Sequence, residues 1–178
     1  SSCSIEFIPF IILHRAWYHT SPFLMAIGLR SLRMICGNSE NAAIKTSGMP
    51  HSTNWEQVRS TFQRIWGYSD FRSPQGEIVQ SLLDKQDALV IMPTGGGKSI
   101  CFQLPALLQT GLTLVVSPLV ALMENQVQEL CDRHLPAALL HSELPNQQRH
   151  QTLRAIEQQK LRLLYVSPET LLSPPVWE

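Results

Sequence analysis

The sequence predicts an α/β fold in which helices cover both faces of a parallel β-sheet. Four short apolar runs are typical of strands, at residues 88–91, 113–117, 137–140 and 161–166. Segments with apolar residues at helical spacing separate these runs, and such alternation is typical of parallel sheets. Ligands of these folds bind at the carboxyl ends of the strands, where the chain also carries a glycine-rich loop after the first run.

Helices are predicted on both sides of that loop. The first has apolar residues on one face, namely Val58, Phe62, Ile65 and Trp66. Thr53 or Asn54 can cap its start and Gly67 can end it. Ser73 and Pro74 then predict a second helix, with serine as the N-cap and proline in the first position. Further helices are predicted over residues 100–108, 119–133 and about 145–159.

The glycine-rich loop, residues 92–99, reads Met-Pro-Thr-Gly-Gly-Gly-Lys-Ser between a predicted strand and a predicted helix. Glycines permit backbone angles at which successive N–H groups point at phosphate oxygens. The predicted triphosphate-binding residues are Thr94, Gly95, Gly96, Gly97, Lys98 and Ser99. Lys98 supplies a positive charge for the β and γ phosphates and is the predicted catalytic residue, and the Ser99 hydroxyl is a predicted Mg²⁺ ligand.

The loop departs from the general pattern Gly-x4-Gly-Lys-Ser/Thr because Met92 occupies the position of the first glycine. The alternative is a glycine-rich turn followed by a chance Lys-Ser pair. That alternative does not account for the strand and helix patterns on the two sides, so they favour phosphate binding.

Composition sets further bounds on the 178-residue chain. Its formal net charge is zero, so binding of a polyanion would depend on local patches and backbone N–H groups. The four cysteines show no Cys-x2-Cys spacing, which favours a reduced intracellular chain and a cytoplasmic location. Residues 16–29 lack Asp, Glu, Lys and Arg but are too short to span a bilayer, so we expect no membrane partner.

Residues 1–48 differ from the rest because their apolar clusters follow no helical or strand period. We expect a disordered leader, or sequence translated from upstream of a natural start at Met49. The predicted domain therefore occupies residues 49–178.

Upstream of the loop, the chain reads Phe62-x3-Trp66-Gly67-x3-Phe71-Arg72-x2-Gln75. Together with the loop, this spacing resembles the RecQ family of superfamily 2 DNA helicases. The resemblance implies a partial RecA-like P-loop NTPase domain that binds ATP with Mg²⁺, in which Gln75 reads adenine while Tyr68 and Arg72 stack on its faces. A glutamine amide suits the N6/N7 edge of adenine, whereas guanine presents the wrong pattern. The alternative is that Tyr68 packs a surface connector and Arg72 is a solvated charge.

Three later segments also resemble RecQ motifs. Residues 117–127 resemble motif Ia, which implies that Ser117 and Pro118 contact single-stranded DNA, although Asn125 replaces the usual aspartate. His141-Ser142 stands where the family has Asn-Ser, which implies that Ser142 contacts the backbone of the DNA strand.

The last segment, residues 165–172, resembles Tyr-x-x-Pro-Glu-Arg-Leu and implies a contact from Pro168. Thr170 replaces the arginine there, which removes a cation. A lone histidine such as His141 is more often a polar loop residue than a ligand.

The resemblance covers about residues 54–178 and implies an ATP-dependent helicase that moves 3′ to 5′ on single-stranded or forked DNA. The family's Asp-Glu-Ala-His element is expected soon after Glu178, so we expect the isolated chain to be a truncated first domain without unwinding activity. Alternatives are a nucleotide or single-strand binding module without turnover, and an inactive truncated product. An RNA helicase of the DEAD-box type is disfavoured by the Phe-Arg-x2-Gln spacing and the triple glycine.

Overall fold

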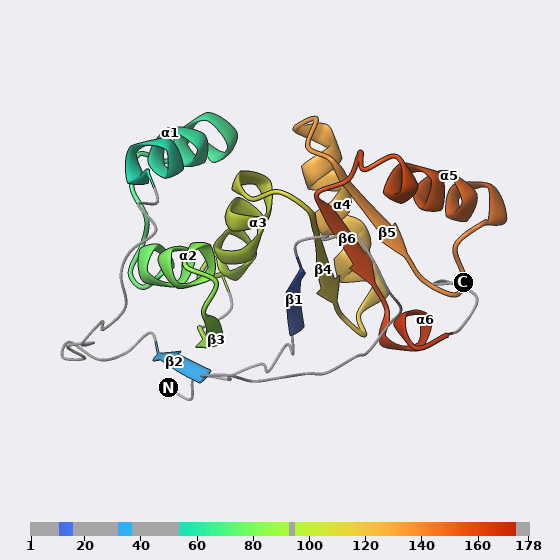
Figure 1. The fold of residues 1–178 in the computed structure, drawn as a ribbon, viewed down its shortest axis with the longest axis horizontal. Helices are drawn as coiled ribbons and strands as arrows, with labels where there is room; N and C mark the ends of the chain where they lie inside the picture. The colour runs from blue at the N-terminus through green and yellow to red at the C-terminus, as the bar shows by residue number, and fades with distance from the viewer. Residues whose placement is uncertain (1–10, 16–31, 37–53, 93–94, 174–178) are drawn as a thin grey trace. The chain divides into compact units, whose positions relative to one another are not determined.

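A computed structural model of the chain describes residues 11–15, 32–36, 54–92 and 95–173, which belong to two compact units. Unit 1 contains β2 (Leu32–Cys36), α1 (Trp55–Trp66), α2 (Gln75–Leu83), β3 (Asp87–Ile91) and α3 (Lys98–Leu108). Unit 2 contains β1 (Ile11–Arg15), β4 (Leu112–Val116), α4 (Val120–Asp132), β5 (Ala137–Leu140), α5 (Asn146–Glu157), β6 (Leu163–Val166) and α6 (Pro168–Leu171). Figure 1 labels these elements.

Unit 2 is built on a sheet with strand order β1-β4-β6-β5. β4, β6 and β5 run parallel, and β1 pairs with β4 in the antiparallel sense. Val116, Val166 and Leu140 occupy matching register positions, so the carboxyl ends of the three parallel strands lie at one edge. The predicted α/β class with a parallel sheet is therefore confirmed.

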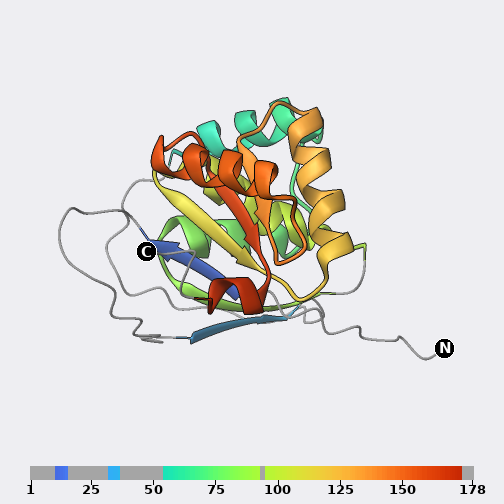
Figure 2. The ribbon, with the colours of Figure 1, turned by 90° about the vertical axis from the view of Figure 1, so that its right-hand side faces the viewer.

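Helices cover the two faces of this sheet. One face carries Leu164 and Val166 against Leu153 and Ile156 of α5, because alternate strand residues point to the same side. The other face carries Val115, Leu163 and Tyr165, all fully buried, and α4 contacts β5 and β6 with its own buried residues Met123, Val127 and Leu130. Figure 2 shows α4 and α5 on opposite sides of the strands. Burial on both faces explains why these strands read as continuous apolar runs.

Unit 1 differs from the predicted single sheet. β3 was expected beside the other three predicted strands, but it pairs in parallel with β2, from Leu32 opposite Asp87 to Cys36 opposite Ile91. A strand edge must satisfy its backbone N–H and C=O groups, and β2 satisfies those of β3 here. β1 and β2 both lie in the segment expected to be a leader, and the proposed origin of that segment stays a prediction.

The cores of unit 1 lie where the helices pack. Val58 and Phe62 of α1, Val79 of α2 and Leu104 of α3 form one cluster. Ile78, Met92 and Cys101 form a second cluster next to the loop, and burial raises the pKa of the Cys101 thiol to about 12. The loop is therefore anchored on its β3 side by an apolar methionine side chain.

The ends of α1 agree with the sequence. Asn54 Oδ1 accepts a hydrogen bond from the Gln57 amide at 3.3 Å, and Gly67 ends the helix with φ 79°. The expected serine cap of α2 is wrong, because Pro74 rather than Ser73 occupies the cap position. No side chain caps the start of α2; the Gln75 Oε1 instead accepts from the amide of Arg72, in the segment before the helix, at 2.9 Å.

Among the described residues, no helix is both long enough and apolar enough to cross a membrane.

Candidate functional site

The glycine-rich loop joins β3 to α3, as predicted from its flanking patterns. Gly95 and Gly97 have φ values of 79° and 74°, a region that side chains with a Cβ rarely occupy. Gly97 occupies the N-cap position of α3, and Lys98 is its first helical residue. Thr94 lies outside the described residues. The loop therefore leads from a strand directly into the N-terminus of a helix, the arrangement that is typical of anion cradles.

Gln75 contacts this loop although it lies on another helix. Its Nε2 donates to the carbonyls of Gly96 and Gly97, each at 3.3 Å, and only 3% of the residue is exposed. A Cβ added at Gly97 would collide with this same Nε2 atom. Gly97 is thus required both by its backbone angle and by the approach of Gln75.

We expect Gly97→Ala to lower the free energy of unfolding of unit 1 by about 1–2 kcal/mol, because alanine is strained at a left-handed position. The new methyl group would also displace the Gln75 amide. Gly76→Ala is the matched control: it lies inside α2, where a Cβ would meet side chains at 3.7 Å or more, so it should be neutral or stabilising. Urea unfolding of both variants measures the difference, and equal stability would contradict the assigned strain.

A pocket of about 130 Å³ lies beside the loop within unit 1. Its lining residues are Phe62, Tyr68, Asp70, Arg72, Gln75, Gly95, Gly97 and Ile100. Cζ of Arg72 lies 6.0 Å from the centroid of the Tyr68 ring, and Tyr68 is 50% exposed. The structure therefore brings together the three residues predicted to bind a base and two of the glycines predicted to bind phosphates. Their roles as ligands stay predictions.

The other predicted loop residues lie at the start of α3. Lys98 Nζ donates to the carbonyl of Met92 at 3.0 Å, so the ammonium group is held over the loop. Ser99 is partly buried in the first turn. No group of three or more His, Cys, Asp or Glu side chains suited to a metal occurs in the part of the chain that the structure describes. The role of Ser99 as a Mg²⁺ ligand stays a prediction; Mg²⁺ commonly keeps several waters and phosphate oxygens among its ligands.

Three pocket residues were not predicted as ligands from the sequence. Phe62 was assigned to the helix core and to the RecQ-like spacing but not to ligand binding, and Asp70 and Ile100 were not singled out. Asp70 lies midway between Tyr68 and Arg72 in the sequence. Its position between two predicted base-binding residues could have identified it as a pocket residue. Its carboxylate pairs with Arg59 at 3.6 Å, and both side chains are exposed.

Unit 2 gathers the other predicted site residues at the carboxyl ends of its parallel strands. We call Ser117, Pro118, His141, Ser142, Ser167 and Pro168 the strand-end edge. The Ser117 amide donates to Val166 and the Ser167 amide to Leu140, each at 3.2 Å, so sheet pairing continues one residue past the strands. Pro118 and Ser142 are exposed, whereas Ser117 is buried and its hydroxyl accepts from the Leu119 amide at 3.3 Å.

The residues that depart from the RecQ pattern also belong to unit 2. Asn125 is exposed on α4. Thr170 is buried, and its hydroxyl shares a hydrogen bond of 2.9 Å with the Ser167 hydroxyl, so position 170 faces inward. Hydrogen bonds from the Ser167 hydroxyl and the backbone hold the pKa of the exposed Glu169 carboxyl below its usual value. Position 170 therefore carries no cation, and the acidic Glu169 lies next to it.

Comparison with known proteins agrees with this arrangement. A sequence model described as DEAD/DEAH box helicase matches residues 72–177, which include Arg72, Gln75, the glycine-rich loop and the strand-end edge. The chain belongs to the DEAD/DEAH box helicase family. Within it, the chain is 63% identical over 122 residues to the ATP-dependent DNA helicase RecQ of Synechocystis sp., covering 68% of this chain and 26% of that protein.

Other relatives show the same pattern. The RecQ helicase of Haemophilus influenzae is 44% identical over 114 residues, 64% of this chain and 18% of its own length. The probable ATP-dependent DNA helicase RecS of Bacillus subtilis is 43% identical over 123 residues, 68% of this chain and 24% of its own length. The resemblance of this helicase-family chain to RecQ is confirmed, and the chain spans about a quarter or less of these curated relatives.

Proposed function

We propose that the chain provides the ATP–Mg²⁺ site and the single-strand contacts of an ATP-dependent DNA helicase of the RecQ type, which moves 3′ to 5′. The observation that carries this proposal is the pocket in unit 1. There the amide of Gln75, which can pair with adenine, contacts the carbonyls of Gly96 and Gly97. These two glycines belong to the loop that is proposed to bind the phosphates. One small site thus combines a base-reading group with an anion cradle.

In this proposal an adenine base lies between Tyr68 and Arg72, which both line the pocket. Stacked bases lie about 3.4 Å apart, so a base between the two groups would need about 7 Å, and they now lie 6.0 Å apart. A small outward movement of the exposed Arg72 side chain would supply the difference. The guanidinium and the phenol ring are both groups that stack on flat π-systems.

The hydrogen bonds of Gln75 link base binding to the loop. Its Oε1 accepts from the Arg72 amide and keeps one lone pair for the N6 amino group of adenine. Its Nε2 donates to Gly96 and Gly97, so a bond to N7 of adenine requires release of one of these carbonyls. Adenine binding would therefore change how the loop is held.

The phosphates would lie against the N-terminus of α3, with Lys98 beside them and Ser99 on the metal ion. Bound ATP–Mg²⁺ supplies a phosphoryl group for transfer to water. The chain's own residues contribute orientation and positive electrostatic potential. Single-stranded DNA would lie along the strand-end edge, where the hydroxyl of Ser142 and backbone amides can donate to phosphates without a net basic charge.

Binding of ATP and GTP to wild type and to Gln75→Ala tests this proposal. Wild type should prefer ATP, and Gln75→Ala should bind ATP roughly tenfold more weakly, because a hydrogen bond is lost in a buried site. Gln80→Ala is the matched control, since Gln80 lies on the same helix but bonds to Asp84 at 3.0 Å. Equal affinity for ATP and GTP would contradict the assigned role of Gln75.

A second experiment separates the alternatives. Saturable ATP and oligonucleotide binding without ATP hydrolysis would favour a binding module over an enzyme. Absence of any saturable nucleotide binding by a folded chain would contradict the proposal as a whole.

A further inference from the structure

A buried histidine at the strand-end edge lacks the partners that its chemistry requires. His141 follows β5 and is 5% exposed, and neither of its ring nitrogens has a hydrogen-bond partner among the described residues. An imidazole carries at least one N–H group in each of its protonation states. A buried donor without an acceptor is costly, so a nearby acceptor is expected to serve it in some state of the protein.

Two carboxylates from other elements interact with this ring. Glu124 of α4 has Oε1 at 4.0 Å from Nε2 of His141, just beyond hydrogen-bond distance. Its side chain is 56% exposed, so it is free to move toward the ring. Glu169 of α6 is also close enough for His141 to contribute to the lowering of its carboxyl pKa, after the larger effect of Ser167. The negative charge of these two carboxylates argues against a DNA phosphate as the partner of this ring.

We propose that His141 is a positioning residue, whose protonated ring donates to Glu124 and so fixes the start of α4 against the end of β5. The inference rests on the proposed DNA contacts of the strand-end edge. Pro118 lies just before α4, and Ser142 lies just after His141. The His141–Glu124 pair therefore sets the distance between two segments that are proposed to contact the same DNA strand.

The pair makes single-strand binding depend on pH. A protonated ring attracts Glu124 and Glu169, and a neutral ring loses this attraction, so the edge should be better ordered at lower pH. Histidine is the side chain that ordinarily changes charge between about pH 5 and 8. Because Glu124 is largely exposed, solvent screens the pair, and we expect an effect of up to about fivefold in affinity.

Binding of a rhodamine-labelled oligothymidine to the full chain at about pH 5.5 and about pH 8 tests this inference. Wild type should bind more tightly at the lower pH, by up to about fivefold, and both Glu124→Gln and His141→Asn should lose most of this difference. Glu129→Gln on α4 and His150→Asn on α5 are matched exposed controls that should retain it. If Glu124→Gln binds more tightly than wild type and keeps the full pH dependence, the ring acts as a simple cation and the inference is wrong.

Hydrogen exchange without DNA separates failure of the inference from failure of the proposed function. After correction for intrinsic rates, peptides covering residues 117–124 should be better protected at low pH in wild type but not in Glu124→Gln. If wild type and variants show the same protection at every pH, the proposed His141–Glu124 interaction is wrong, whatever the result of DNA binding. If the pH-dependent protection is present and no oligonucleotide binds, the pair stands and the proposed DNA role fails.

Discussion

Lys98→Ala is expected to weaken binding of ATP–Mg²⁺ by roughly ten- to hundredfold. The ammonium group is held over the glycine-rich loop by its hydrogen bond to Met92, and alanine removes the positive charge nearest to the proposed phosphates. Hydrogen bonds to charged groups contribute about 1.5–3 kcal/mol, and each 1.4 kcal/mol changes affinity about tenfold. Titration with a fluorescent ATP analogue measures the loss.

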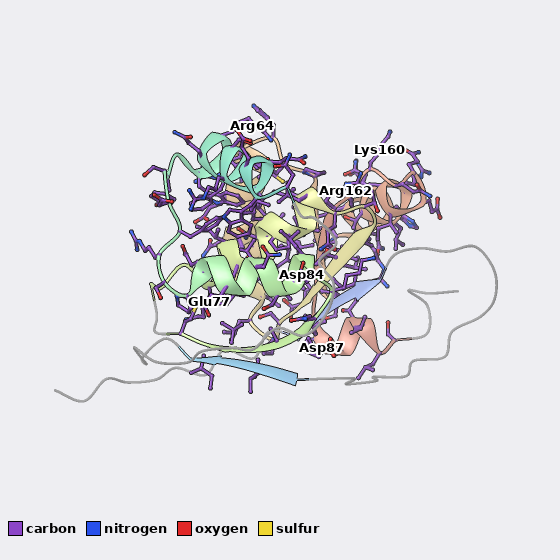
Figure 3. All side chains as sticks on the ribbon, turned by 60° about the vertical axis from the view of Figure 1, so that its left-hand side comes forward. Arg64, Glu77, Asp84, Asp87, Lys160 and Arg162 are labelled. Carbon is purple, nitrogen blue, oxygen red and sulfur yellow. The ribbon has the colours of Figure 1, made fainter. Side chains whose placement is uncertain are left out.

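Lys160→Ala is the control for this change. Figure 3 labels Lys160 together with Arg162, on the connection between α5 and β6 in unit 2, where Arg162 Nη1 donates to Gly111 at 3.4 Å. Lys160 is exposed, so its loss should leave nucleotide binding unchanged. Lys98→Ala should also remain folded, because it removes a partly buried side chain at the start of a helix. ATP affinity equal to that of wild type would exclude Lys98 from the phosphate site.

Phe62→Ala should lower the free energy of unfolding of unit 1 by about 3–5 kcal/mol, the usual cost of removing a buried aromatic ring. Phe62 is 1% exposed and packs in the cluster with Val79 and Leu104. Its ring stacks on Phe71 at 4.3 Å between centroids and lies 5.9 Å from Tyr68. The substitution therefore removes the support of the predicted base-binding residues as well as part of a core.

Urea unfolding followed by tryptophan fluorescence measures this effect, since Trp55 and Trp66 both lie on α1. Arg64→Ala on the same helix is the control: its side chain is exposed, and we expect a change below about 1 kcal/mol. A loss below about 1 kcal/mol in Phe62→Ala would show that the aromatic cluster contributes little to unit 1.

The sequence predicted the elements of the fold better than their pairing. β4, β5 and β6 are buried on both faces, so their apolar runs identify them within two residues of their ends. β1 and β2 were missed because their segment has no side-chain period, and they are defined by backbone bonds to the edges of β4 and β3. α6 has four residues, which is too short to show a helical period.

The candidate sites were predicted by residue type but not by contact. The spacing of Tyr68, Arg72 and Gln75 identified three of the residues that line the pocket in unit 1, but not Phe62, Asp70 or Ile100. Contacts between Gln75 and the loop carbonyls join residues more than 20 positions apart, and no local pattern encodes such an approach. The carboxylates around His141 come from α4 and α6, so their meeting also depends on the tertiary fold.

The amides of Ser117 and Ser167 extend the sheet pairing past β4 and β6. Main-chain bonds of this kind do not depend on which side chain a residue carries. Substitutions along the strand-end edge can therefore alter its chemistry while leaving its backbone conformation unchanged. A protein built this way can acquire new responses, such as sensitivity to acidity, without redesign of its scaffold.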